Sequence, residues 1–203
     1  MKYISYEKVD AIDVNGEYIQ TKNCTVKERR AVYYIVLHYT GNKKDTAVSN
    51  AKYFYNNTLN ASAHFFVDEE CIYQSVALKD VAWHVGTKGK YLNGCRNNNS
   101  LGVEMCCSDN YTIGEKTIAK AEELVVELCR MLDIAEDKVD QFVVRHYDVT
   151  GKKCPKEWAE DEDGFVRFKE RVKAKLREEL WDIKGHWAEK DIKMLYAKGI
   201  VKG

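Results

Sequence analysis

The chain has 203 residues, 45% of them hydrophobic, which suffices for one catalytic-sized domain with a small appendage. Lysine plus arginine equals aspartate plus glutamate at 32 each, and this zero net charge argues against a nucleic-acid partner. No apolar run approaches the roughly 20 residues of a membrane span, and residues 1–5 show no basic-then-apolar leader. We therefore expect a protein made in the cytoplasm without a signal peptide and without membrane insertion. Seven scattered cysteines favour reduced thiols over a disulfide framework.

The first strong strand is predicted at residues 31–39, where a near-continuous apolar run is typical of a central strand buried on both faces. His38 lies at its C-terminal end, where α/β folds place their chemistry; a hydrogen-bonded core histidine is the alternative. A helix is expected next, capped by Asp45 or Thr46 and running to about Asn56. Its inward positions are expected to be Ala47, Ala51, Phe54 and Tyr55.

Residues 62–68 and 71–74 are predicted to form a β-hairpin around Glu69 and Glu70. His64 lies at the entrance of the first hairpin strand, and Trp83 and His84 follow on a later loop. Because loops carry binding surfaces, we expect these three side chains to contact a substrate. A structural position in the core is the alternative for His64 and for Trp83.

A second buried strand is predicted at residues 100–107. Alternation places Leu101, Val103 and Met105 on one face and Gly102, Glu104 and Cys106 on the other. A glutamate within such an apolar run is costly unless it is paired or employed. This position favours a functional role for Glu104 over a solvated face of the strand.

Two amphipathic helices are expected in the second half of the chain. The first covers residues 115–132, with Cys129 on its apolar stripe and therefore in the core. The second is marked by apolar residues at helical spacing, namely Phe165, Phe168, Val172, Leu176 and Leu180. Between them, residues 141–145 are predicted to form a strand that delivers His146.

The segment from Arg145 to Pro155 offers the imidazole of His146 and the thiol of Cys154 eight residues apart. That spacing does not fit one helix face, so the two must converge through a loop, as ligands of a metal do. An ordinary turn with a surface histidine and a buried cysteine is the alternative. With His38 they would give zinc three ligands and leave one position open for water. A fourth ligand from His64 or another cysteine would instead close the site.

The neighbouring groups suit amide hydrolysis. Zinc lowers the pKa of a bound water and polarises a carbonyl. Glu104 can take the proton of that water and pass it to the leaving amine. Lys152, two residues before Cys154, would stabilise the oxyanion, a contribution of roughly 3 kcal/mol; an exposed loop cation is the alternative.

Five motifs occur in order: residues 36–40, 62–68, 83–84, 99–104 and 146–155. Together they resemble the type-2 family of zinc-dependent N-acetylmuramoyl-L-alanine amidases, which includes phage endolysins and peptidoglycan recognition proteins. The resemblance covers about residues 30–178. It implies cleavage of the amide between the lactyl group of muramic acid and the L-alanine of the stem peptide. It also implies one zinc ion.

The resemblance assigns roles to individual residues. It implies that His38, His146 and Cys154 are the zinc ligands and that Lys152 and Glu104 are catalytic. Ala63 departs from the pattern, since some phage-type members carry a catalytic tyrosine at this position. Without that phenol, catalysis would depend on Glu104.

These observations predict an α/β fold with a central mixed β-sheet flanked by helices, zinc in a surface groove and a short helical C-terminal appendage. We expect a catalytic domain at residues 1–180. Residues 181–203 resemble the first half of an S-layer homology repeat, a wall-anchoring element that would bind a secondary cell-wall polymer.

We expect the partner to be bacterial peptidoglycan and the protein to be a phage or prophage endolysin that reaches the wall after its release. A host autolysin or recycling amidase is one alternative. A non-catalytic recognition module is another, but such modules typically lack the sulfur ligand that Cys154 supplies.

Overall fold

The computed structural model describes residues 3–5, 20–27, 29–86 and 94–178. Its centre is a five-stranded sheet in the order β6-β5-β8-β4-β9. The strands are β4 (Tyr34–Tyr39), β5 (Phe65–Val67), β6 (Ile72–Gln74), β8 (Ser100–Met105) and β9 (Val143–Arg145). Strands β5, β8, β4 and β9 run parallel, whereas β6 returns antiparallel to β5, so the predicted mixed sheet and the predicted hairpin are confirmed.

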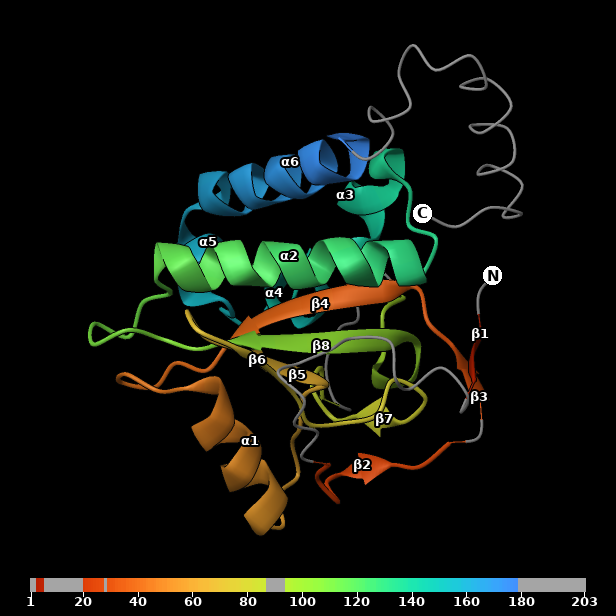
Figure 1. Cartoon of the computed structure of the whole chain (residues 1–203), viewed down its shortest axis with the longest axis vertical. Coiled ribbons are helices and arrows are strands. Elements are labelled where there is room, and N and C mark those ends of the chain that lie inside the picture. The colour runs from red at the N-terminus through yellow and green to blue at the C-terminus, as the bar shows by residue number, and fades with distance from the viewer. Residues whose placement is uncertain (1–2, 6–19, 28, 87–93, 179–203) are drawn as a thin grey trace.

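Two smaller sheets lie beside the central one (Figure 1). One pairs β1 (Tyr3–Ser5) with β3 (Arg29–Ala31), and the other pairs β2 (Cys24–Thr25) with β7 (Val81–Ala82). The second pairing carries the chain toward the loop that holds Trp83 and His84.

Helices cover both faces of the central sheet (Figure 1). The helices are α1 (Ala47–Asn56), α2 (Glu115–Met131), α3 (Val139–Phe142), α4 (His146–Thr150), α5 (Lys156–Glu160) and α6 (Glu162–Glu178). Helix α2 lies on one face with α6 stacked outside it, and α1 packs on the opposite face beside β5 and β6. Within the described residues, no helix has the length and apolar character that crossing a membrane requires.

The core is organised by strand alternation. Leu37, Leu101 and Val103 belong to the large cluster that packs against α2 and α6, where Leu124 and Phe168 are also buried. Each such side chain contributes about 1.5–3 kcal/mol by leaving water. On the other face lie two small apolar clusters, one that contains Val36 and one that contains Cys106. The predicted division of residues 101–106 between two faces is therefore confirmed.

Helix α1 begins as its sequence indicates. The side chain of the N-cap residue Thr46 accepts from the Ser49 N–H at 3.2 Å, and the Ser49 hydroxyl accepts from the Thr46 N–H at 3.2 Å. This reciprocal capping box is worth about 1 kcal/mol. The prediction that Tyr55 points inward is wrong, because its side chain is 55% exposed. The stripe through Ala47, Ala51 and Phe54 packs against the sheet, and Asn50 is buried beside it.

Four predicted strands differ from the structure in their boundaries. The first hairpin strand, expected at 62–68, covers only Phe65–Val67. The strand expected at 31–39 is interrupted, since β3 ends at Ala31 and β4 begins at Tyr34. The strand expected at 141–145 begins only at Val143, because the preceding residues complete α3. The strand expected at 100–107 ends at Met105. Leu180 and the appendage expected at 181–203 lie outside the described residues.

Candidate metal centre

Sheet register brings the first candidate residues together. His38 of β4 is the direct partner of Glu104 of β8, and both lie on the face opposite α2. On the other side of β4, Leu37 pairs with Arg145 at the end of β9, so His146 emerges beside His38. All three side chains therefore leave the carboxyl ends of parallel strands, where open α/β sheets form their sites.

The segment 146–154 consists of α4 and a short hydrogen-bonded loop, and it brings Cys154 back to this edge of the sheet. After α4, Gly151 adopts a left-handed conformation (φ 79°) that favours glycine, and its N–H donates to the Tyr147 carbonyl at 2.9 Å. The N–H of Tyr147 then donates to the Cys154 carbonyl at 3.0 Å. The predicted convergence of His146 and Cys154 is thus achieved, although one helical turn precedes the expected loop.

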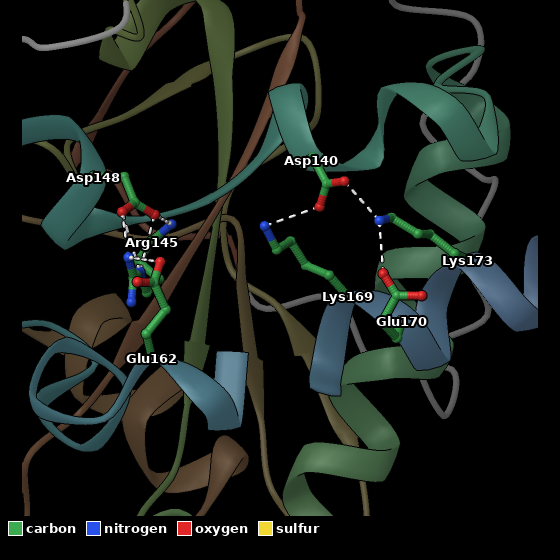
Figure 2. Close-up of polar contacts among 7 residues, drawn as sticks. All are labelled: Asp140, Arg145, Asp148, Glu162, Lys169, Glu170 and Lys173. Carbon is green, nitrogen blue, oxygen red and sulfur yellow. Dashed lines mark hydrogen bonds and ion pairs between the residues drawn. The ribbon is translucent and has the colours of Figure 1, made fainter. Parts of the chain in front are cut away.

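Arg145 holds the segment 146–154 in place from the other face of the sheet (Figure 2). Its guanidinium donates to both carboxylate oxygens of Asp148, with Nη2 to Oδ1 at 2.6 Å and Nε to Oδ2 at 3.0 Å. It also donates to the Trp158 carbonyl at 2.6 Å and forms an ion pair with Glu162 at 3.3 Å. Because Asp148 also accepts from the Arg145 N–H at 2.8 Å, the start of α4 is fixed where His146 stands.

The three candidate ligands form a buried cluster. One ligand atom from each of His38, His146 and Cys154 lies within 4.8 Å of the others, and in the described part of the chain no other group of three such residues meets this criterion. The Cys154 Sγ lies 3.8 Å from Nδ1 of His38. Nδ1 of His146 is buried and has no hydrogen-bond partner among the described residues. A buried nitrogen without a hydrogen-bond partner is suited to coordinate a metal ion.

The protonation of the imidazoles agrees with that role. Burial, followed by the neighbouring His146, lowers the pKa of His38 well below its usual value. Burial, followed by Lys152, lowers the pKa of His146 to about 4. Burial, followed by Glu104, raises the pKa of Cys154 to about 12. Both rings are therefore neutral near pH 7, as metal binding requires, and a cation would be needed to hold the thiolate. Two imidazoles and one thiolate are a donor set suited to zinc.

Glu104 lies beside this cluster. Its Oε1 is 4.0 Å from Nδ1 of His38, its Oε2 is buried without a hydrogen-bond partner among the described residues, and the side chain keeps 23% exposure. Burial raises the pKa of Glu104 to about 7, while the exposed Lys152 lowers it and Asp45 raises it further. A carboxyl group with a pKa near the working pH can both take and give a proton.

The three residues expected to contact substrate occupy different environments. His64 is fully buried, and its Nδ1 accepts from the Gly102 N–H at 2.9 Å while its Nε2 contacts the Asp80 carbonyl at 3.2 Å. These bonds favour a structural role for His64 and leave it outside the candidate ligand group. Trp83 is half-buried, and its indole N–H donates to the Thr25 hydroxyl at 3.0 Å. His84 is 8% exposed and lies against His38.

An α/β domain with a buried His-His-Cys cluster and a carboxylate of raised pKa beside it has the parts of a metal-dependent hydrolase. Comparison with known sequences names the family. Residues 28–157 match the N-acetylmuramoyl-L-alanine amidase family Amidase_2, and the chain belongs to this family.

Curated relatives agree with this assignment. The chain is 37% identical over 153 residues to the N-acetylmuramoyl-L-alanine amidase BlyA of Bacillus subtilis, an alignment that spans 70% of this chain and 41% of BlyA. It is 34% identical to the amidase CwlL of Bacillus licheniformis, over 70% of this chain and 41% of CwlL. The chain thus spans about two fifths of the length of these relatives.

Solved structures show the same fold. The catalytic domain of XlyA superimposes with a TM-score of 0.61 at 28% identity, covering 77% of this chain and 99% of that domain. A mutant endolysin from Bacillus subtilis gives a TM-score of 0.62 at 29% identity, covering 77% of this chain and 98% of the other.

Sequence reasoning missed the surroundings of the candidate ligands. It did not anticipate the contact between His84 and His38 or the anchoring of α4 by Arg145. The glycine in the middle of the buried strand β8 was a usable sign, because such a glycine often marks the close approach of another group. At Gly102 that group is the ring of His84.

Proposed function

We propose that this chain is a zinc-dependent peptidoglycan hydrolase that cleaves the amide between N-acetylmuramic acid and the L-alanine of the stem peptide. The observation that carries the proposal is the buried cluster of His38, His146 and Cys154 with Glu104 at its edge. The names of the relatives support the choice of bond, since BlyA and CwlL are N-acetylmuramoyl-L-alanine amidases.

A zinc ion at this cluster would polarise the scissile carbonyl and acidify the attacking water. Glu104 accepts the proton of that water and delivers it to the leaving nitrogen of L-alanine. A positioned acid–base group of this kind contributes about 10²–10⁴-fold to the rate. Lys152 is exposed, yet its charge acts on Glu104 and His146, which puts it within electrostatic reach of the reacting carbonyl. Its cationic group stabilises the negative charge that develops on the carbonyl oxygen.

A non-catalytic peptidoglycan-binding module is the second candidate. Binding alone needs neither a buried thiol beside two imidazoles nor a carboxyl group with a pKa of about 7. Cys154 and Glu104 therefore favour the hydrolase.

We further propose that residues 1–180 form the catalytic domain and that residues 181–203 help to bind a wall polymer. The resemblance to a partial S-layer homology repeat supports the second assignment. An endolysin that acts on the wall after its release from the cytoplasm is the setting we propose, with a host autolysin or recycling amidase as the variant.

The test is digestion of purified cell walls by the zinc-loaded protein, with new L-alanine amino termini measured by end-group labelling. We expect release by the wild type, loss with a chelator and recovery on adding zinc. Glu104→Gln preserves side-chain size and should retain zinc while turnover falls by about 10²–10⁴-fold. Glu123→Gln, an exposed position on α2, is the matched control. Absence of new L-alanine termini with the zinc-loaded wild type would show that the chain is not this amidase.

A further inference from the structure

A buried chain of hydrogen bonds runs away from the candidate ligand His38. Nε2 of His38 lies 3.0 Å from Nδ1 of His84, and Nε2 of His84 lies 3.0 Å from the hydroxyl of Ser100. That hydroxyl donates to the carbonyl of Arg96 at 2.7 Å. His38, His84 and Ser100 are exposed by only 1%, 8% and 0%, so the two contacts that join them form away from water, whereas the bond to Arg96 is part-buried.

The last acceptor, the Arg96 carbonyl, sets the direction of every hydrogen bond in this series. A carbonyl only accepts, so the Arg96 carbonyl takes the single hydrogen of the Ser100 hydroxyl. The Cys95 thiol also lies beside this hydroxyl, but sulfur is a weak acceptor and does not compete with a carbonyl. The Ser100 oxygen therefore accepts from the Nε2–H of His84. Burial favours the neutral form of this ring, which then carries no hydrogen on Nδ1. Nδ1 of His84 is then an acceptor, and it receives the Nε2–H of His38.

This direction decides which nitrogen of His38 is left for a metal. A neutral imidazole with its hydrogen on Nε2 has its lone pair on Nδ1. Nδ1 is the atom that faces the Cys154 sulfur at 3.8 Å and Glu104 at 4.0 Å. A ring with the opposite tautomer would present an N–H to the cluster and could not bind a cation there.

We propose that His84 is a positioning residue that fixes the tautomer of His38 and thereby keeps Nδ1 available as a metal ligand. The proposal rests on the proposed zinc site, but it replaces the expected substrate contact of His84 with a role through His38. Histidine ligands commonly donate their second nitrogen to a carboxylate, a carbonyl or water. In this protein the acceptor is a second histidine, His84. The hydrogen bond from Nε2 of His84 to Ser100 leaves Nδ1 of His84 without a hydrogen, so that Nδ1 can accept from His38.

The surroundings of His84 hold its ring in this place. The N–H groups of His84 and Val85 both donate to Oδ1 of Asn97, at 3.0 and 2.9 Å. The ring packs closely against Gly102 of β8, where an added Cβ would lie 2.7 Å from Cγ and 2.8 Å from Nδ1 of His84. Glycine weakens a strand interior, so its presence in β8 is explained by the space that the His84 ring needs.

Two substitutions of matched shape separate the hydrogen bond from simple packing. In His84→Asn, Oδ1 stands close to the position of the original Nδ1 and can still accept from His38. In His84→Leu, a methyl group stands there and cannot. We expect His84→Leu to weaken zinc binding by about 10–100-fold, measured by competition with a chromogenic chelator, and His84→Asn to recover most of the affinity.

The tautomer is measured directly, without metal or activity, from imidazole ¹⁵N shifts of the labelled, metal-free protein. We expect neutral His38 to carry its hydrogen on Nε2 in the wild type and in His84→Asn. In His84→Leu we expect a mixture of the Nε2–H and Nδ1–H tautomers. Ser100→Ala removes the acceptor at the far end and should also mix the tautomers of His84 and His38. This variant tests the proposal even if His84→Leu does not fold.

Val125→Ala, a buried truncation in α2, controls for lost stability and should leave zinc affinity unchanged. The proposal is overturned if wild-type His38 carries its hydrogen on Nδ1, or if His84→Leu binds zinc as tightly as the wild type. It is also overturned if Val125→Ala weakens zinc binding as much as His84→Leu does. If the wild type binds no zinc at all, the proposed function fails, while the ¹⁵N measurement still decides the tautomer.

Discussion

Arg145 and Lys173 form ion-pair clusters that look alike in Figure 2 but differ in burial. The Arg145 side chain is 7% exposed, lies 4.8 Å from the ring centre of Phe165, and pairs with Asp148, which is 27% exposed. Lys173 is 14% exposed, but its partners Asp140 and Glu170 are 58% and 56% exposed. We therefore expect the two clusters to differ in their contribution to stability.

Arg145→Ala removes the guanidinium donors of the half-buried Asp148 and of the Trp158 carbonyl, and Asp148 keeps only the backbone N–H of residue 145 among the Arg145 donors. Breaking a buried pair costs about 3–5 kcal/mol, and the solvent access of Asp148 places this case near 3 kcal/mol. Lys173→Ala removes exposed pairs worth about 0–1 kcal/mol. For a protein of this size, a loss of 3 kcal/mol lowers the Tm by roughly 6–12 °C.

The assay is urea unfolding followed by far-ultraviolet circular dichroism, with zinc affinity as a second measurement. Because His146 directly follows Arg145, we expect Arg145→Ala to weaken zinc binding as well, and Lys173→Ala to leave it unchanged. Equal losses of unfolding free energy in the two variants would refute the argument from burial. An unchanged zinc affinity in Arg145→Ala would refute the anchoring of α4.

Three further predictions concern single side chains. Cys154→Ser should lose zinc on dialysis, as measured by metal analysis, because a hydroxyl replaces a thiolate poorly; zinc retained at the wild-type level would remove Cys154 from the ligand set. Phe168→Ala, at a fully buried position of α6, should cost about 3–5 kcal/mol in urea unfolding, and a loss below 1 kcal/mol would contradict the core described above. The Lys173 hydrogen bond, aided by Lys169, holds the pKa of Asp140 below its usual value, so its stabilising effect is present near pH 7 and disappears as the pH falls below about 4. Asp140→Asn should therefore be less stable than the wild type at pH 7, and the difference should shrink as the pH falls below about 4; a difference that stays constant as the pH falls would exclude this linkage.

The sequence was most informative where a pattern repeats over several residues. Alternation in β8 correctly assigned Leu101 and Glu104 to opposite faces, because a strand of six residues contains three full periods. The start of α1 was predicted to be capped by Asp45 or Thr46, because both residue types accept hydrogen bonds at helix starts, and the structure shows that Thr46 is the cap.

The same reasoning failed for short helices and strands. Helix α3 has four residues and α4 has five, too few to show a helical period, so the strand before His146 was drawn two residues too long. The approach of His84 to His38 joins residues 46 positions apart, and no local pattern encodes such a contact. The eight-residue spacing of His146 and Cys154 indicated convergence but not the route, which depends on the left-handed Gly151.

The alternation of β4 and β8 also has a use in protein engineering. Leu37 and Val103 point into the α2 layer, whereas their immediate neighbours His38 and Glu104 point the other way. Repacking libraries confined to the α2 layer would therefore vary heat tolerance while every reactive side chain keeps its identity. A more heat-stable version of this chain can be sought on one side of the sheet alone.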